Sequence, residues 1–216
     1  MHKLDHIVLG AYTLERGTEF VEDILQAKMS DIGYHKDMGT HNRVIRINDD
    51  VYFEVVAIDP EIKNFKHRRW FNLDNQNLQL KLKKVPQIIG YVVENNNKIP
   101  LKYYNPFFNA SRLNYRWQFA MPKYKYNILD YQIIETCIIP SLISWKSEKP
   151  IYQMNTNQFE LIKLEIEFPE SRCHFNTFFT AFGETKHVSV LSTIEDNAPI
   201  IKLKIKDNLR NMIVSF

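Results

Sequence analysis

The feature that most constrains the fold is an order of strand-like and helix-like segments near the start of the chain. Leu4–Leu9 has the composition of a β-strand, and Thr13 after it can cap a helix whose apolar residues share one face. Three more strand-like stretches follow, at Lys28–Tyr34, Asn42–Ile47 and Val51–Ile58. Residues 1–60 therefore predict a β-α-β-β-β module.

The last part of the chain, residues 156–216, repeats this order. Strict alternation predicts a strand at Glu160–Phe168. Phenylalanines spaced i, i+3, i+4 and i+7 then predict a helix with an apolar core stripe, between an N-cap at Ser171 and a C-cap at Gly183. Three further strands complete the unit: Lys186–Leu191, Pro199–Lys206 and Asn211–Phe216. We therefore expect a C-terminal β-α-β-β-β-like unit packed on the rest.

Residues 61–155 are less regular and predict a second, helix-depleted module with a connecting segment. A charged helix or turn is expected at Pro60–Trp70, and a loop at Asn72–Asn77. Strands are expected at Gln87–Glu94, Arg116–Ala120 and Ile138–Trp145. The fold class is thus α+β, and repeated units of this size pack together to share a core.

Composition narrows the functional classes. The chain of 216 residues has a net charge of +3, which is too weakly basic to indicate nucleic-acid binding. The nucleotide motifs G-x-G-x-x-G and G-x-x-x-x-G-K-[ST] are absent, as is G-x-S-x-G. No apolar run is long enough for a membrane helix, and the two cysteines, Cys137 and Cys173, form no C-x-x-C pair. We expect a cytoplasmic protein, a monomer or homodimer, with neither nucleic acid nor membrane as partner.

Two metal-capable side chains lie in the first module. Alternation along a strand places His6 opposite Ile7, and Glu54 opposite Phe53. If the helix packs on the more apolar faces, His6 and Glu54 point together to the other face. An imidazole nitrogen and a carboxylate oxygen suit Zn, Fe, Ni or Mn. The alternative is a hydrogen-bonded His–Glu pair beneath a pocket or a dimer interface.

Other candidates lie in the loop before a pocket strand and in a basic–aromatic patch. His35, His41 and Asn42 flank the Gly39–Thr40 pair and can supply ligands or hydrogen bonds, although loop histidines are more often exposed to solvent. Arg112, Arg116 and Trp117 can bind a carboxylate or phosphate, or the arginines can pair with surface carboxylates.

Two long stretches carry a resemblance to a known family: "LDHIVLGAYTLERGTEFVEDILQ" and "GTHNRVIRINDDVYFEVVAIDP". With "RWFNLDN", "SRLNYRW" and "IPSLISW", they resemble the glyoxalase-like domain of the vicinal oxygen chelate superfamily. That branch is similar to the glyoxalase, bleomycin-resistance and extradiol dioxygenase fold. The resemblance extends to about residue 170.

The resemblance implies paired β-α-β-β-β modules that form curved, mostly antiparallel sheets around a cavity, with the helices outside. His6 and Glu54 match the metal-ligand positions of the first module. In the second module, Tyr91 is the one conceivable ligand on its first strand, and Ser144 stands where relatives carry Glu. The predicted ligand pocket comprises His41, Asn42, Tyr52, Tyr91, Arg116, Trp117 and Ser144.

Two functions remain open at this point. One is a lyase, isomerase or dioxygenase-type enzyme that acts on a small oxygenated molecule with the help of one divalent metal ion, Zn, Fe, Ni or Mn. The other is a metal-free protein that binds or sequesters a small molecule in a cavity with a degenerate metal site. A filled cavity would instead indicate a structural or interaction role.

Overall fold

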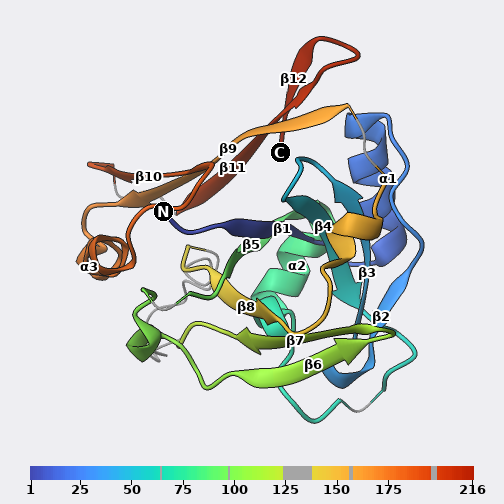
Figure 1. Ribbon diagram of the computed structural model, residues 1–216, viewed down its shortest axis with the longest axis horizontal. Coiled ribbons are helices and arrows are strands. Elements are labelled where there is room, and N and C mark those ends of the chain that lie inside the picture. The colour runs from blue at the N-terminus through green and yellow to red at the C-terminus, as the bar shows by residue number, and fades with distance from the viewer. Residues whose placement is uncertain (64, 97, 124–137, 156–157, 196–198) are drawn as a thin grey trace.

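The computed structural model describes residues 1–63, 65–96, 98–123, 138–155, 158–195 and 199–216, and Cys137 lies outside these ranges. The described residues form an α+β fold with two sheets and three α-helices (Figure 1). The helices are α1 (Leu14–Leu25), α2 (Gln76–Lys84) and α3 (Cys173–Phe182). None of the helices in these ranges has the length and apolarity that a bilayer span requires.

The larger sheet is built from two modules that meet at its centre. Its strand order is β2-β3-β4-β1-β5-β8-β7-β6, so each module contributes four adjacent strands. Strand β1 runs parallel to β4 of its own module and antiparallel to β5 of the next. The strands are β1 (Leu4–Gly10), β2 (Gly33–His35), β3 (Thr40–Arg46), β4 (Tyr52–Ile58), β5 (Gln87–Glu94), β6 (Phe108–Arg112), β7 (Tyr115–Ala120) and β8 (Ser141–Trp145).

The sheet curls until its two edges approach each other. Arg112 on β6 reaches across to β3, where its Nη1 donates to Asn42 Oδ1 at 2.8 Å. This side chain passes over β2 at Gly33, where a built Cβ would lie 1.8 Å from Arg112 Nη1. The paired modules and the curved, mostly antiparallel sheet around a cavity are therefore confirmed.

Helix α1 follows its predicted pattern closely. Thr13 Oγ1 accepts from the Arg16 N–H, and Gln26 ends the helix in the left-handed region. Its buried face, which includes Leu14, Val21 and Leu25, packs in one core with apolar residues of β1 and β4. The apolar side of the first module is thus covered, and its other side faces the interior of the curved sheet.

Gly17, in the middle of α1, is expected to resist substitution by alanine. Alanine favours a helix interior by about 1 kcal/mol over glycine, but a Cβ here would lie 2.5 Å from both Ala11 Cβ and Val55 Cγ1. Overpacking of this kind costs about 1–3 kcal/mol. Gly17→Ala should therefore lower the free energy of unfolding by about 1 kcal/mol, as measured by urea denaturation. Glu19→Ala on the exposed face of α1 is the control, and a stabilised Gly17→Ala would contradict the packing argument.

The connecting segment agrees with the sequence prediction only in part: the described residues of Pro60–Trp70 contain turns, as one alternative predicted, and no α-helix. The helix lies at α2, later than Pro60–Trp70, and the predicted loop includes its N-cap, because Asn75 Oδ1 accepts from the Leu78 N–H. The pattern is weak because only Leu78 and Leu82 of α2 are buried, among exposed lysines. These two leucines pack with Trp70 and Phe71 in an apolar cluster on the concave side of the sheet.

Two smaller predictions were also wrong. Strand β6 was not predicted, because its sequence FNASR has one aromatic residue, Phe108, and no β-branched residue to mark a strand. Helix α3 has Arg172 as its N-cap, with no side-chain cap, and not Ser171. The C-terminal cap at Gly183 is confirmed.

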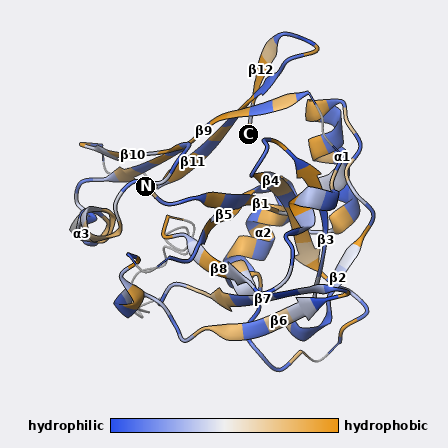
Figure 2. Cartoon of the chain, viewed as in Figure 1, coloured by the Kyte–Doolittle hydropathy of each residue, from blue (hydrophilic) through white to orange (hydrophobic). Residues whose placement is uncertain are grey.

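The C-terminal unit repeats the element order of the first module but not its strand pairing. Its sheet, ordered β10-β9-β11-β12, places β9 between β10 and β11, whereas β1 pairs with the last strand of its own module. Polar and apolar residues alternate along β9 and β11 (Figure 2). The strands are β9 (Phe159–Pro169), β10 (Val188–Thr193), β11 (Ile200–Asp207) and β12 (Met212–Ser215).

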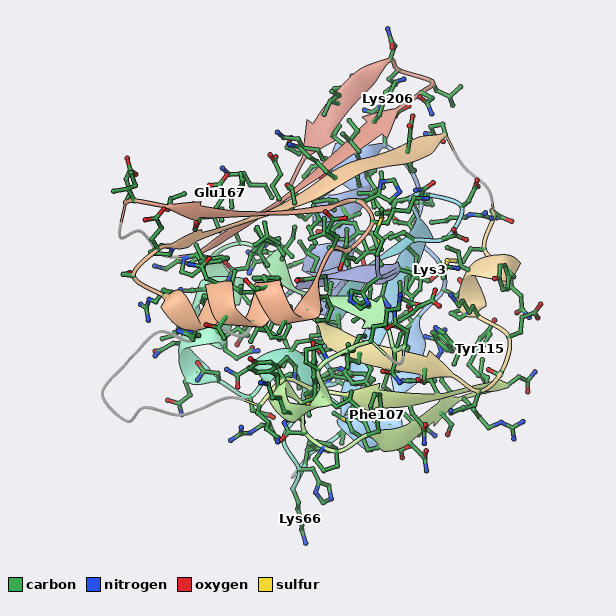
Figure 3. The ribbon with its side chains drawn as sticks, turned by 60° about the vertical axis from the view of Figure 1, so that its left-hand side comes forward. Lys3, Lys66, Phe107, Tyr115, Glu167 and Lys206 are labelled. Atoms are coloured by element: carbon green, nitrogen blue, oxygen red, sulfur yellow. The ribbon has the colours of Figure 1, made fainter. Side chains whose placement is uncertain are left out.

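The C-terminal unit shares the main core with the outer side of the curved sheet (Figure 3). Phe175, Phe178 and Phe182 of α3 are buried there, as predicted for a core stripe. Arg210, after β11, donates to the carbonyls of Ile24 and Leu25 and so caps the end of α1. The unit therefore braces the module that carries His6 and Glu54 from outside the cavity.

Candidate functional site

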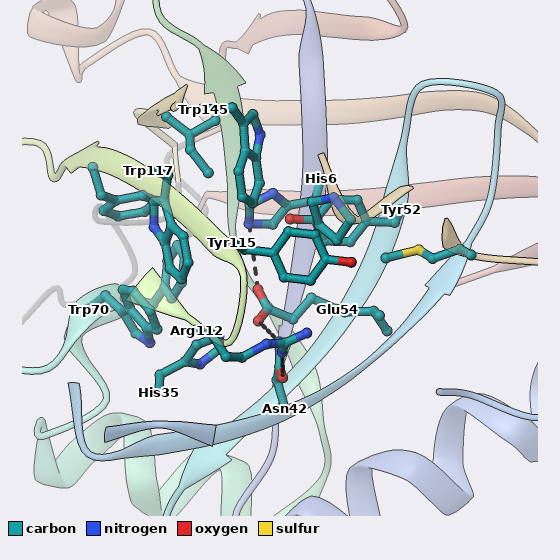
Figure 4. Close-up of a pocket in the computed structure, with 16 residues that line it drawn as sticks. His6, His35, Asn42, Tyr52, Glu54, Trp70, Arg112, Tyr115, Trp117 and Trp145 are labelled. Atoms are coloured by element: carbon teal, nitrogen blue, oxygen red, sulfur yellow. Dashed lines mark hydrogen bonds and ion pairs between the residues drawn. The ribbon is translucent and has the colours of Figure 1, made fainter. Parts of the chain in front are cut away.

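A cavity lies on the concave side of the larger sheet (Figure 4). Its empty space is about 520 Å³, a figure that includes the part open to solvent. The lining combines a few polar side chains with many aromatic ones: His6, His35, Asn42, Val44, Tyr52, Glu54, Trp70, Phe71, Arg112, Tyr115, Trp117, Phe119, Ile143, Trp145, Pro150 and Met154.

Strand register brings His6 and Glu54 together at this cavity. His6 pairs with Tyr52 and Val8 with Glu54, so the two side chains are diagonal neighbours on one face of β1 and β4. His6 Nε2 lies 3.5 Å from Glu54 Oε2. His6 and Glu54 thus lie on one face of the sheet, as strand alternation predicts.

Asp5 also contacts His6, although the two residues are neighbours along β1. Alternation would send Asp5 away from His6, but the pairing of β1 with β5 is irregular between Leu4 and His6. Asp5 Oδ1 consequently lies 2.6 Å from His6 Nδ1. Trp145 Nε1 donates to Asp5 Oδ2 at 2.8 Å, and Lys149 Nζ is 3.9 Å from the same oxygen. Because Asp5 accepts, Nδ1 of His6 carries the hydrogen and Nε2 is turned to Glu54.

The environment of Glu54 favours its neutral form. Burial raises the pKa of the Glu54 carboxyl, and His6, a hydrogen bond from Asn42 and the charge of Arg112 oppose that rise. Asn42 Nδ2 donates to Glu54 Oε1 at 2.6 Å. On the other side, Tyr52 stacks on His6 with ring centroids 4.6 Å apart, and burial raises the pKa of Tyr52 well above its usual value. The Tyr52 side chain therefore stays neutral where it stacks on the imidazole of His6.

His35 is a second buried histidine of the cavity. Burial, and then the nearby Arg112 guanidinium, lower the pKa of His35 to about 3. Its ring stands edge-on to Trp70 at 4.8 Å, and Trp70 Nε1 donates to Thr40 Oγ1 at 3.1 Å. His35 is thus a neutral imidazole at physiological pH.

The structure places some of the predicted pocket residues at the cavity and others away from it. Asn42, Tyr52 and Trp117 line the cavity. His41 is buried on β3, with its Nε2 unpartnered among the described residues, and burial lowers its pKa. Arg116 is exposed on β7 beside Trp117.

The remaining two predicted residues also lie away from the cavity lining. The Tyr91 hydroxyl donates to the Ile138 carbonyl within the main core. Ser144 Oγ accepts from Asn95 Nδ2 at 3.2 Å. The structure therefore does not bring Tyr91 and Ser144 to His6.

Several lining residues were not among the predicted pocket set. Trp70 and Trp145 stand in "RWFNLDN" and "IPSLISW", the stretches that carry the family resemblance, which was a usable signal. Arg112 was part of the predicted basic–aromatic patch. His35 flanks the same Gly39–Thr40 pair as His41 and Asn42, which was its sequence signal. Asp5, which contacts His6, had no local signal, because a strand irregularity places it.

The donor set does not fit a tightly held metal ion. A separation of 3.5 Å between His6 Nε2 and Glu54 Oε2 is wide enough for an ion, but catalytic zinc sites take about three protein ligands. The second module offers Ile89 and Val92 in the concave cluster, and Phe71 covers Gly90, with a built Cβ 3.0 Å from its ring. Across the described ranges, no three His, Cys, Asp or Glu side chains gather to hold an ion.

Two four-stranded modules around one cavity, the first of them β-α-β-β-β with His6 and Glu54, define the architecture of a vicinal oxygen chelate protein. A family model described as a glyoxalase-like domain matches residues 4–176. The chain belongs to this glyoxalase-like family, within the vicinal oxygen chelate superfamily. A search of curated proteins found no match.

Of three solved structures with detectable similarity, one matches the whole chain and two match part of it. A hypothetical protein from Staphylococcus aureus is 17% identical, covers 100% of this chain and 99% of its own, and has a TM-score of 0.63. A methylmalonyl-CoA epimerase variant from Streptomyces coelicolor, in complex with 2-nitronate-propionyl-CoA, is 13% identical with a TM-score of 0.44 over 69% of this chain and 99% of its own. The epimerase from Mycobacterium tuberculosis is 12% identical, with a TM-score of 0.41 over 69% and 91%. The first of these supports the fold of the whole chain, including the C-terminal unit.

Proposed function

We propose that the protein is an enzyme that moves a proton on a small carbonyl compound held in the cavity, an isomerase- or lyase-type reaction. The observation that carries this proposal is the buried series Asp5–His6–Glu54, in which each imidazole nitrogen faces a carboxyl group. Buried acid–base groups with opposed environments are typical of proton-transfer sites.

Each member of the series has a distinct role in the proposal. Asp5 holds the Nδ1 hydrogen of His6, so the basic Nε2 points into the cavity. Nε2 accepts a proton from a carbon next to the substrate carbonyl, which breaks a C–H bond and leaves an enolate. Glu54, whose pKa is raised by burial, returns a proton to carbon from its protonated form, which the raised pKa makes more abundant.

Loss of α-hydrogen signals in heavy water is the test of this reaction. Small aldehydes, ketones and acids with slow spontaneous exchange are incubated with the protein and followed by proton NMR. We expect wild-type protein to exchange at least one compound about 100-fold faster than His6→Ala or Glu54→Gln. Lys3→Ala, on an exposed side chain, is the control.

The effect of metal ions on this exchange distinguishes the two functions that the sequence left open. The site offers two metal-capable side chains, His6 and Glu54. We therefore expect that treatment with a chelator leaves the exchange rate unchanged. We also expect that added Zn²⁺, Mn²⁺ or Ni²⁺ does not raise the melting temperature. Exchange that requires one of these ions would overturn the metal-independent reaction. Ligand binding without exchange would instead favour a metal-free binding or sequestering protein. Cytoplasmic location and a monomeric or homodimeric state stay predictions from the sequence.

A further inference from the structure

All three tryptophans of the chain line the cavity (Figure 4). They come from separate parts of the second module: Trp70 precedes α2, Trp117 lies on β7 and Trp145 on β8. The rings of Trp117 and Trp145 have centroids 5.5 Å apart at 48°. Flat indole faces of this kind favour contact with another flat ring.

Arg112 is the permanently charged cation of the lining, since the low pKa of His35 keeps that residue neutral. A guanidinium has five N–H donors. Within the described residues, the side-chain partner of Arg112 is Asn42, at 2.8 Å, and no carboxylate lies within ion-pair distance. Most of its donors are therefore available to a bound anion.

Asn42 fixes where that anion would lie relative to the acid–base pair. Its Oδ1 accepts from Arg112 and its Nδ2 donates to Glu54 Oε1 at 2.6 Å. Arg112 and Glu54 are thus separated by one side chain. A carboxylate bound to Arg112 would have its neighbouring carbon near His6 and Glu54, and its apolar part toward the tryptophans.

We propose that the cavity takes a compact aromatic carboxylate, with its carboxylate on Arg112 and its ring against Trp117 and Trp145. This substrate class rests on the proposed function, because it uses the same cavity and places an acidic C–H beside His6. A lining that places one cation, Arg112, beside the indole rings of Trp117 and Trp145 favours a single ring with a short acid side chain. The raised pKa of Glu54 reduces repulsion between its carboxyl group and the incoming anion.

The tryptophans provide a direct readout, because all three lie at the cavity. Phenylacetate is titrated while tryptophan fluorescence is followed, alongside its neutral isostere phenylacetamide and the non-planar cyclohexylacetate. We expect saturable quenching by phenylacetate. Phenylacetamide should bind about 10- to 100-fold more weakly because it loses the charge-assisted pair, and cyclohexylacetate about 2- to 10-fold more weakly because it loses the ring contact.

Variants of Arg112 test which group holds the acid. Arg112→Gln should weaken phenylacetate binding about 10- to 100-fold and leave phenylacetamide binding unchanged. Arg112→Lys, which keeps the charge, should lose less. Arg116→Gln on the exposed side of β7 is the matched control. The acid-to-amide ratio also guards against misfolding, because a misfolded variant loses both ligands.

Two results would overturn the proposal: phenylacetamide binding as tightly as phenylacetate, or Arg112→Gln leaving phenylacetate affinity intact. Failure of this substrate class is distinct from failure of the proton-transfer reaction. Phenylacetate binding through Arg112 without any α-hydrogen exchange would contradict the reaction alone. Exchange on compounds that do not depend on Arg112 would contradict the aromatic carboxylate alone.

Discussion

Replacing Asp5 with alanine is expected to lower the free energy of unfolding by about 3 kcal/mol, because buried groups lose their partner. Asp5 is 1% exposed. Its carboxylate accepts from His6 Nδ1 and Trp145 Nε1, and it lies 3.9 Å from Lys149 Nζ. At about 2–4 °C per kcal/mol for a chain of this size, calorimetry should show a melting temperature lower by about 6–12 °C.

Asp5→Asn separates the structural role of Asp5 from its role at His6. The amide keeps the shape and one acceptor oxygen, so its loss of stability should be smaller than that of alanine. An amide nitrogen facing His6 Nδ1 would move the histidine hydrogen to Nε2, so α-hydrogen exchange should fall to about the level of His6→Ala, about 100-fold below wild type. Asp49→Ala, with a side chain 95% exposed, is the control. An unchanged melting temperature in Asp5→Ala would refute the description of Asp5 as a buried hydrogen-bonding centre.

The half of the site on the first module could be predicted because it depends on local rules. Strand alternation placed His6 and Glu54 on one face, and the register of β1 with β4 has them there. The same rule failed for Asp5, since the irregular pairing beside Leu4 reverses its direction. Such irregularities depend on the neighbouring strand β5, which no local pattern reveals.

The other half of the site depends on how the sheet closes. Arg112 reaches Asn42 because the edge strand β6 curls round to β2 and β3, segments far apart along the chain. Trp70 reaches the cavity from the turn before α2. The sequence did not predict helix α2, because its N-terminal part was read as a loop and the rest is rich in lysines. Contacts of this kind follow from the tertiary arrangement and not from periodicity.

The metal question shows the same division between family pattern and individual residues. The resemblance correctly implied the architecture, and it pointed to Ser144 and the strand at Gln87–Glu94 as the places where ligands would be missing. In the structure, Phe71 lies against Gly90 of that strand, and Ile143 and Trp145 of β8 line the cavity. Apolar side chains thus stand on the second module near the places where a metal site would need donors.

Glu54→Gln is expected to stabilise the protein at neutral and alkaline pH, by about 2 kcal/mol, while abolishing exchange. Burial raises the pKa of Glu54 above its ordinary value of 4.5, so the folded state binds a proton more tightly than the unfolded state does. Stability therefore falls as pH rises from about 4.5 through the folded-state pKa. Glutamine carries no such charge and keeps an oxygen for the N–H of Asn42.

The pH dependence makes this prediction specific. The difference in melting temperature between Glu54→Gln and wild type should be small well below pH 4.5, where the carboxyl is largely protonated in both states, and should grow to about 4–8 °C above the folded-state pKa. Glu160→Gln, on an exposed side chain of β9, should change little at any pH. A Glu54→Gln variant less stable than wild type at pH 8 would mean that Glu54 is a charged structural partner of His6. A gain in stability with a loss of exchange would identify Glu54 as a group kept for chemistry at a cost to the fold.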